Sequence, residues 1–144
     1  MDPSFIAFLQ KSPWHMTLFG TALVTGGMLI WPLFSRLLVG NVAQVGAFEA
    51  VQLINRRDAV VLDVRDKADY AAGHIPEARN IPLPELAGRL RELEKFKSRP
   101  VVVNCQSGTR AAGVCNVLKK SGFEVFALRG GISGWAQAGM PVEK

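Results

Sequence analysis

The chain has few of the residues that build disulfide frameworks or metal sites. Its 144 residues include two cysteines, ten positions apart, and two histidines. So few cysteines argue against a disulfide framework, and their spacing matches no zinc-binding pattern. The sequence therefore predicts no metal ion and no other cofactor, and each thiol has to be explained singly.

Charge of one sign is not concentrated anywhere in the chain. The net charge is +5, from 17 Lys and Arg and 12 Asp and Glu. In the most basic stretch, residues 89–99, cations alternate with Glu92 and Glu94, which is typical of a solvated helix face. No basic cluster is interleaved with aromatic residues, so the sequence predicts no nucleic-acid binding. A mild attraction for small anions is expected instead.

Charged residues are missing altogether from residues 16–34. As a helix, these nineteen residues would span roughly 29 Å, about the thickness of the hydrocarbon core of a bilayer. Trp14 and Trp31 lie near the two ends, where indole rings favour the membrane interface. We therefore expect a single-pass transmembrane helix over residues 14–36, preceded by an N-terminal segment, residues 1–13.

A cleaved signal peptide and a buried core helix are the competing interpretations of this stretch. A signal peptide normally has a basic leading region, a shorter apolar core and a small-x-small cleavage site close behind it. Here the leading region is nearly neutral, and the best cleavage site, after Ala47, would cut into the next predicted helix. A core helix of this length without a charge would be unusual. Because a reactive thiol stays reduced in the cytosol, we expect the rest of the chain on the cytoplasmic side.

After a predicted linker, residues 37–45, the segment 46–144 alternates predicted strands and helices. Continuous apolar runs at 59–64 and 101–104 are typical of strands that are buried on both faces. Apolar residues at helical spacing predict the intervening helices, one of them near 84–95. This alternation predicts an α/β fold with a central parallel sheet flanked by helices, in which ligands bind at the carboxyl ends of the strands.

Cys105 lies at such a strand end, directly before a helix predicted over residues 109–121. Loop amides and a helix N-terminus favour the thiolate there, which is the nucleophilic form of cysteine. Arg110 would add positive charge. Alternatively Cys105 is a small buried hydrophobic residue, but the Ser, Gly, Thr and Arg that follow it favour the reactive interpretation. Cys115 falls on the apolar stripe of the same helix, so we expect it in the core.

Three stretches, taken in this order, resemble the rhodanese-like sulfurtransferase domain. The first is residues 62–82, with Leu-Asp-Val-Arg and Gly-His-Ile-Pro; the second is the Cys105 loop, Cys-Gln-Ser-Gly-Thr-Arg; the third is residues 128–141, with Leu-Arg-Gly-Gly and Gly-Met-Pro. They cover nearly all of residues 44–144. With the expected anchor, the resemblance implies a membrane-anchored single-domain protein with a rhodanese-like domain over residues 46–144.

The resemblance also implies a reaction and its site residues. Cys105 would accept a sulfane sulfur from a small donor such as thiosulfate or a persulfide, and would pass it to a thiol or a cyanide-like acceptor. The loop from Cys105 to Arg110 has six residues, as in rhodanese-like sulfurtransferases, whereas related dual-specificity phosphatases have one more. A phosphatase or an arsenate reductase is therefore disfavoured. The residues between Cys105 and Arg110 would bind substrate, mainly through their amides: Gln106, Ser107, Gly108 and Thr109.

Three charged residues near the loop have more than one possible role. Arg110 could stabilise the anion, tie the helix to a carboxylate such as Asp63, or do both. Arg65 could bind an anionic donor, or could form an exposed ion pair with Asp66 or Asp69. For Asp63 the resemblance implies a structural anchor near the site rather than a catalytic acid.

Two functions therefore stay open. One is a thiosulfate sulfurtransferase-like enzyme that uses Cys105 and Arg110 as catalytic residues. The other is a membrane-tethered module that binds a membrane-protein partner, with incidental turnover or none. The intact cysteine and arginine favour the enzyme, since a docking domain could do without either.

Overall fold

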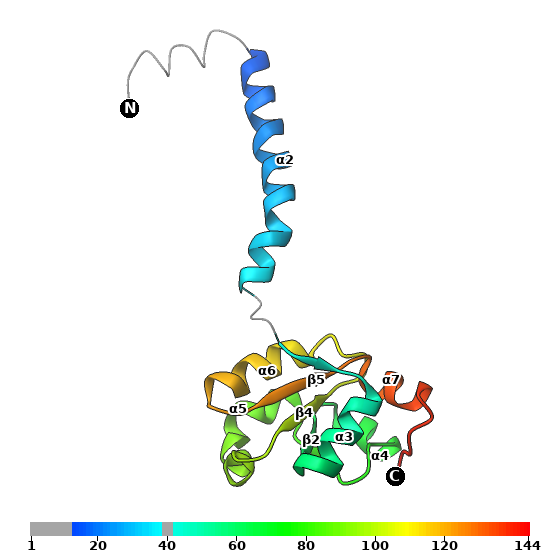
Figure 1. Cartoon of the computed structure of the whole chain (residues 1–144). Helices are drawn as coiled ribbons and strands as arrows, with labels where there is room; N and C mark the ends of the chain where they lie inside the picture. The colour runs from blue at the N-terminus through cyan, green and yellow to red at the C-terminus, as the bar shows by residue number, and fades with distance from the viewer. Residues whose placement is uncertain (1–12, 39–41) are drawn as a thin grey trace. The chain divides into compact units, whose positions relative to one another are not determined.

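The computed structural model describes residues 13–38 and 42–144, which belong to two separate units divided after residue 40. In the first unit, Pro13–Leu38 forms the helix α2 (Figure 1). Among the described residues, no helix combines the length and the apolar character that a membrane span needs. The transmembrane helix expected over residues 14–36 is thus not shown, and residues 1–12 lie outside the described part of the chain.

The side chains of α2 are nevertheless mostly apolar and exposed. The ten large apolar residues of α2 named below are between 53% and 79% exposed. The hydroxyls of Thr17, Thr21 and Thr25 donate hydrogen bonds to carbonyls one turn earlier, so they are satisfied within the helix. The exposed apolar side chains are Trp14, Leu18, Phe19, Leu23, Val24, Met28, Leu29, Ile30, Trp31 and Phe34.

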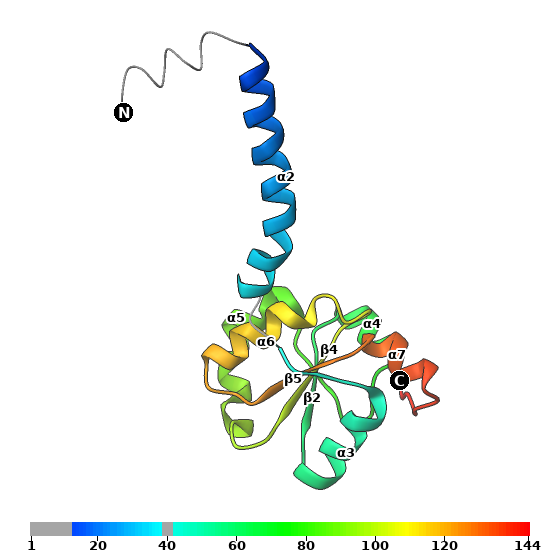
Figure 2. The same cartoon turned by 45° about the horizontal axis from the view of Figure 1, so that its top comes forward.

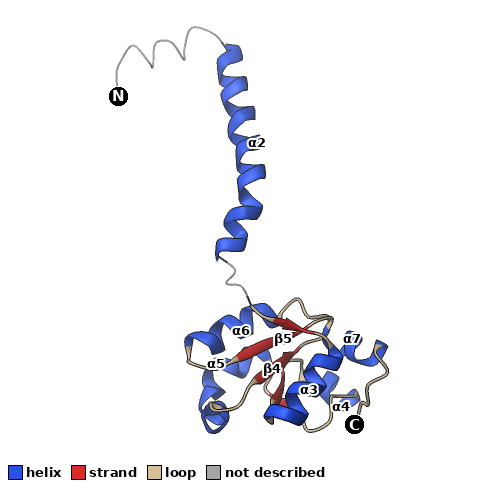
Figure 3. Ribbon diagram, in the orientation of Figure 1, coloured by secondary structure: helices blue, strands red, loops and turns tan. Residues whose placement is uncertain are grey.

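The second unit is built on a parallel sheet of five strands in the order β1-β5-β4-β2-β3. Figure 3 shows strands of this sheet in red, with helices around them. The strands are β1 (Gln44–Val45), β2 (Val60–Asp63), β3 (Arg79–Asn80), β4 (Val101–Asn104) and β5 (Val125–Leu128). The central parallel sheet predicted from the sequence is confirmed. The predicted linker is shorter than expected, because its last two residues form β1 and pair with β5.

Helices cover both faces of the sheet (Figure 2). They are α3 (Ala47–Arg57), α4 (Lys67–Ala72), η1 (Leu83–Glu85), α5 (Leu86–Arg89), η2 (Leu90–Phe96), α6 (Ala111–Lys120) and α7 (Gly131–Gln137). One buried cluster joins α5, η2 and α6 to the sheet, and a second joins α3 and α7 to the opposite face. As expected, Cys115 lies in the first cluster and is fully buried.

The helix predicted near residues 84–95 is replaced by three short segments, η1, α5 and η2. Pro82 and Pro84 fix the start of this region as a 3₁₀ turn. Further on, Leu90, Leu93 and Phe96 recur every third residue, which matches the three residues per turn of a 3₁₀ helix. The leucine spacing that suggests an α-helix is therefore satisfied by a tighter helix.

Candidate active site

Cys105 follows β4, the middle strand of the sheet, and its side chain is almost fully buried at the carboxyl end of that strand. The backbone N–H of Gly108 donates a hydrogen bond of 2.9 Å to Cys105 Sγ, which stabilises negative charge on the sulfur. Gly108 adopts φ +87°, where a side chain would be strained, and its backbone lies close to Gly130. The loop thus curls back over the thiol.

The loop is also supported by the turn that begins α7. The N–H of Ile132 donates to the carbonyl of Cys105 at 2.9 Å, and the hydroxyl of Ser133 donates to the carbonyl of Gln106 at 3.1 Å. Gly131 has φ +57°, and a Cβ at this position would overlap the carbonyl oxygen of Cys105. The Gly-Gly pair of the third sequence motif therefore belongs to the site, a role that the sequence analysis did not assign to it.

A buried ion pair lies at the carboxyl ends of the neighbouring strands. Arg65 Nη2 lies 2.8 Å from Asp63 Oδ2, and Arg65 Nε lies 3.1 Å from both carboxylate oxygens. Asp63 also accepts from the backbone N–H of Arg65 and from Asn104 Nδ2. Arg65 Nη2 donates in addition to the carbonyl of Gly73 at 2.8 Å. The exposed ion pair with Asp66 or Asp69 that the sequence suggested for Arg65 is wrong, because its guanidinium is buried and paired with Asp63.

A pocket of about 410 Å³ opens beside Cys105. Its lining brings together six predicted site residues, namely Arg65, Cys105, Gln106, Ser107, Thr109 and Arg110. In the described part of the chain, Arg110 has no carboxylate partner within ion-pair distance, and Asp63 is paired with Arg65 instead. Together with Val64, the exposed carboxylates of Asp66 and Asp69 complete the lining. Asp66 and Asp69 were not predicted as pocket residues, because nothing in their sequence spacing indicates that they lie beside the Cys105 loop.

The two thiols differ in their surroundings. Burial, and to a smaller extent the charge of the nearby Cys105, raise the pKa of Cys115 to about 12. Cys115 therefore stays a neutral thiol near pH 7, whereas Cys105 lines the pocket and receives an amide hydrogen bond. Within residues 13–38 and 42–144, no three His, Cys, Asp or Glu side chains lie close enough together to hold a metal ion.

Comparison with known proteins gives consistent matches. The model of the rhodanese-like domain family matches residues 47–138. The uncharacterised protein YibN of Escherichia coli K12 is 40% identical over 107 residues, which cover 73% of this chain and 75% of that protein. A sulfurtransferase of Allochromatium vinosum is 37% identical over 92 residues, covering 63% and 84% of the two chains.

A solved structure extends the likeness to three dimensions. The crystal structure of a rhodanese-related protein from Thermoplasma volcanium superposes with a TM-score of 0.64 at 30% identity. The match covers 70% of this chain and 97% of that one.

Proposed function

This chain belongs to the rhodanese-like domain family, and from that premise we propose that it is a sulfurtransferase carrying sulfane sulfur as a persulfide on Cys105. The main support for this proposal is the position of Cys105 Sγ. The sulfur lies at the carboxyl end of the central strand, lines a pocket, and accepts a hydrogen bond from the Gly108 amide. The sulfurtransferase from Allochromatium vinosum supports the same reaction class.

The proposed reaction has two covalent steps. In the first, the Cys105 thiolate attacks the outer sulfur of thiosulfate; the sulfur–sulfur bond of the donor breaks and its electron pair leaves with sulfite. In the second, a thiolate or cyanide attacks the terminal sulfur of the persulfide. The persulfide bond then breaks, and its electron pair returns to Cys105 as thiolate.

The residues around Cys105 have distinct proposed roles in these steps. Negative charge resides on sulfur before and after each transfer, and the amides of the loop from Gln106 to Thr109 would stabilise it by donating hydrogen bonds. Arg110 is proposed as the second catalytic residue, because its unpaired guanidinium borders the pocket and would offset the charge of donor and persulfide. Substrate binding by Arg65 is expected to be indirect, since its guanidinium is already bound to Asp63.

The test is the intact mass of the purified, reduced protein after exposure to thiosulfate. We expect a gain of one sulfur atom, which cyanide removes as thiocyanate. A Cys115→Ala variant should show the same gain, since this thiol is buried and neutral. A folded, reduced protein that takes no sulfur from thiosulfate or from cysteine persulfide would contradict the proposal and would favour the interaction module.

We also propose that α2 holds the chain at a membrane as a single-pass anchor, with the rhodanese-like domain on the cytoplasmic side. The uncharged stretch 16–34 and the exposed apolar side chains of α2 support this, because such side chains need an apolar environment. The cytoplasmic side follows from the need to keep Cys105 reduced. A membrane-protein partner would be the natural acceptor or binding target for a domain held in this way.

Carbonate extraction of cell membranes tests the anchor. The full chain should stay in the membrane pellet, and a Leu23→Asp, Leu29→Asp double variant should move to the soluble fraction, since each carboxylate in a bilayer costs about 3 kcal/mol. Val117→Asp is the matched control, because Val117 is an exposed apolar residue of the other unit. If carbonate extracts the unaltered chain, the proposed anchor is wrong.

A further inference from the structure

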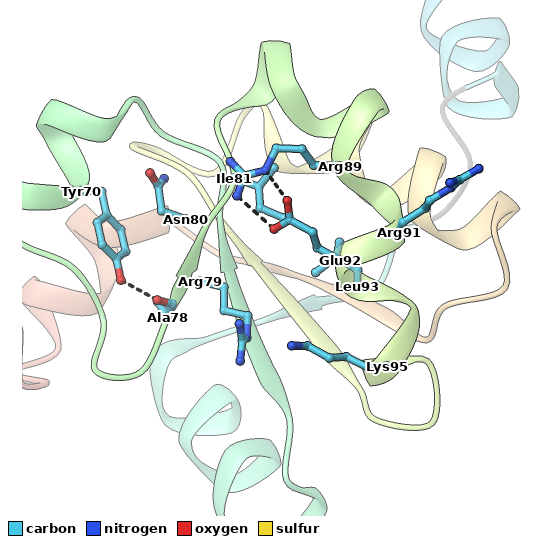
Figure 4. Close-up of a pocket in the computed structure, with 10 residues that line it drawn as sticks. All are labelled: Tyr70, Ala78, Arg79, Asn80, Ile81, Arg89, Arg91, Glu92, Leu93 and Lys95. Carbon is cyan, nitrogen blue, oxygen red and sulfur yellow. Dashed lines mark hydrogen bonds and ion pairs between the residues drawn. The ribbon is translucent and has the colours of Figure 1, made fainter.

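A second hollow, of about 450 Å³, lies at the β3 edge of the sheet and shares no lining residue with the Cys105 pocket. Cationic side chains line it from two segments, and in Figure 4 Lys95 points toward Arg79, whereas Arg91 points away from the other lining residues. Arg79 comes from β3, Arg89 from the end of α5, and Arg91 and Lys95 from η2. Glu92 is the one acidic residue in the lining.

The cations of this pocket are only partly neutralised. Arg89 is fully engaged: it donates to Glu92 at 2.7 and 3.0 Å and to Glu85 at 2.8 Å. Among the described residues, Arg79, Arg91 and Lys95 have no carboxylate within ion-pair distance. The pKa of Glu92 is lowered by the hydrogen bond from Arg89 and also by the charges of Lys95 and Arg79, so this carboxylate remains ionised. The pocket therefore keeps a net positive charge.

Two of the unpaired cations are held over one aromatic ring. The guanidinium of Arg79 lies 4.5 Å from the centroid of Phe96, and the Lys95 ammonium lies 5.1 Å from it. Phe96 itself is buried, so its ring is a fixed platform. Cation–π contacts of this kind hold the charges in place without neutralising them. The cations are thus positioned before any ligand arrives.

Two polar residues in the wall of the pocket, Tyr70 and Asn80, are held in place by hydrogen bonds to backbone carbonyls. Tyr70 Oη donates to the carbonyl of Ala78 at 2.6 Å. Asn80 Nδ2 donates to the carbonyls of Asp63 and Arg65, at 3.1 and 2.9 Å. These contacts tie the wall of the pocket to the end of β2, so the hollow is a built feature of the fold rather than a gap between loose side chains.

We propose that this pocket binds a small phosphate ester that carries at least two negative charges. Arginine matches the oxygens of a phosphate group with paired N–H donors, and Arg79 and Lys95 are both available here. A concave site of this volume takes a small molecule or a headgroup rather than a nucleic-acid duplex. A soluble metabolite and the headgroup of an anionic lipid share this chemistry.

Calorimetric titration of the full chain in neutral detergent with pyrophosphate, at constant ionic strength, tests the site. We expect saturable binding of one anion per chain. Arg79→Gln and Lys95→Gln should each weaken it about tenfold, the loss expected for one charge-assisted hydrogen bond. Lys119→Gln removes the same charge from an exposed position of α6 and should change nothing. Unfolding temperatures within about 4 °C of the unaltered protein show that the variants are folded.

Vesicle flotation distinguishes the two sources of the phosphate. If the ligand is a headgroup, binding to vesicles that contain phosphatidic acid, a phosphate monoester, should exceed binding to phosphatidylcholine vesicles, and Lys95→Gln should abolish the difference. If the ligand is soluble, pyrophosphate should bind while the variant leaves the lipid preference unchanged. The proposal is overturned if pyrophosphate does not saturate the protein, if Arg79→Gln and Lys95→Gln bind it as well as the unaltered chain, or if a glutamate-rich peptide binds there and pyrophosphate does not displace it.

Discussion

A Cys105→Ser variant is expected to gain no sulfur atom from thiosulfate and to lose sulfur transfer to cyanide by about a thousandfold or more. The serine hydroxyl is similar in size and can accept the hydrogen bond that Gly108 N–H gives to the sulfur, so the loop should keep its shape. At neutral pH, however, the hydroxyl supplies almost no oxyanion, and it forms no persulfide. The loss should therefore appear in the chemical step and not in folding.

Two measurements separate these effects. Thiocyanate production gives kcat/KM, and intact mass gives the sulfur content of the protein. Cys115→Ala is the matched control, since it also removes one thiol but leaves the pocket intact, and it should retain transfer when assayed well below its unfolding temperature. Sulfur uptake by the Cys105→Ser variant would place the chemistry at another residue and refute the proposed role of Cys105.

The Asp63→Ala variant should lose about 3–5 kcal/mol of unfolding free energy. The substitution leaves the guanidinium of Arg65 buried without its carboxylate, and it also removes an acceptor for Asn104 Nδ2. Domains of this kind have unfolding free energies of about 5–15 kcal/mol in total, so the loss is a large fraction of the whole. Guanidinium chloride unfolding measures it, and an unchanged slope would show that the native state stays compact.

Two further variants test whether the loss of stability comes from the buried pair of Asp63 and Arg65. The double variant Asp63→Ala, Arg65→Met removes both charges and should recover much of the lost stability, because neither charge is then left unpaired. Asp66→Asn changes an exposed carboxylate three residues along the chain and should alter stability by no more than about 0.5 kcal/mol. A loss below about 1 kcal/mol for Asp63→Ala would mean that water reaches Arg65 and replaces the carboxylate.

Local patterns in the sequence are enough to predict the strands β2 and β4 and the helix α6, which follows the Cys105 loop. β2 and β4 are four-residue strands in which every residue is buried, and the first three residues of each form a continuous apolar run. The stripe of α6 is likewise visible, because Ala111, Val114 and Leu118 repeat at helical spacing and are all buried. For the segment after Pro84, the same kind of pattern predicts the wrong type of helix. Its leucines fit two helical periods, and only packing against the sheet chooses between them.

The parts of the site that sequence analysis missed are those made by distant segments. The six-residue loop is continuous in sequence, so its length and composition could be judged directly. The turn at Gly131 and Ile132 supports the carbonyl of Cys105, and Arg79 and Lys95, from separate segments, both lie over the ring of Phe96. No spacing rule predicts such contacts, because they depend on how strands and turns are arranged in three dimensions.

The hydrogen bond from Ile132 to the carbonyl of Cys105 has a consequence for synthesis. The loop that follows Cys105 takes its final form against the turn at Gly131 and Ile132, which is translated well after it. While a ribosome is still making β5, the nascent chain already contains Cys105 but not the turn that shapes its loop. Since domains fold largely as units as they emerge, the Cys105 loop takes its final form only when almost the whole domain is outside the exit tunnel. An incomplete chain would therefore present Cys105 without the turn that shapes its loop.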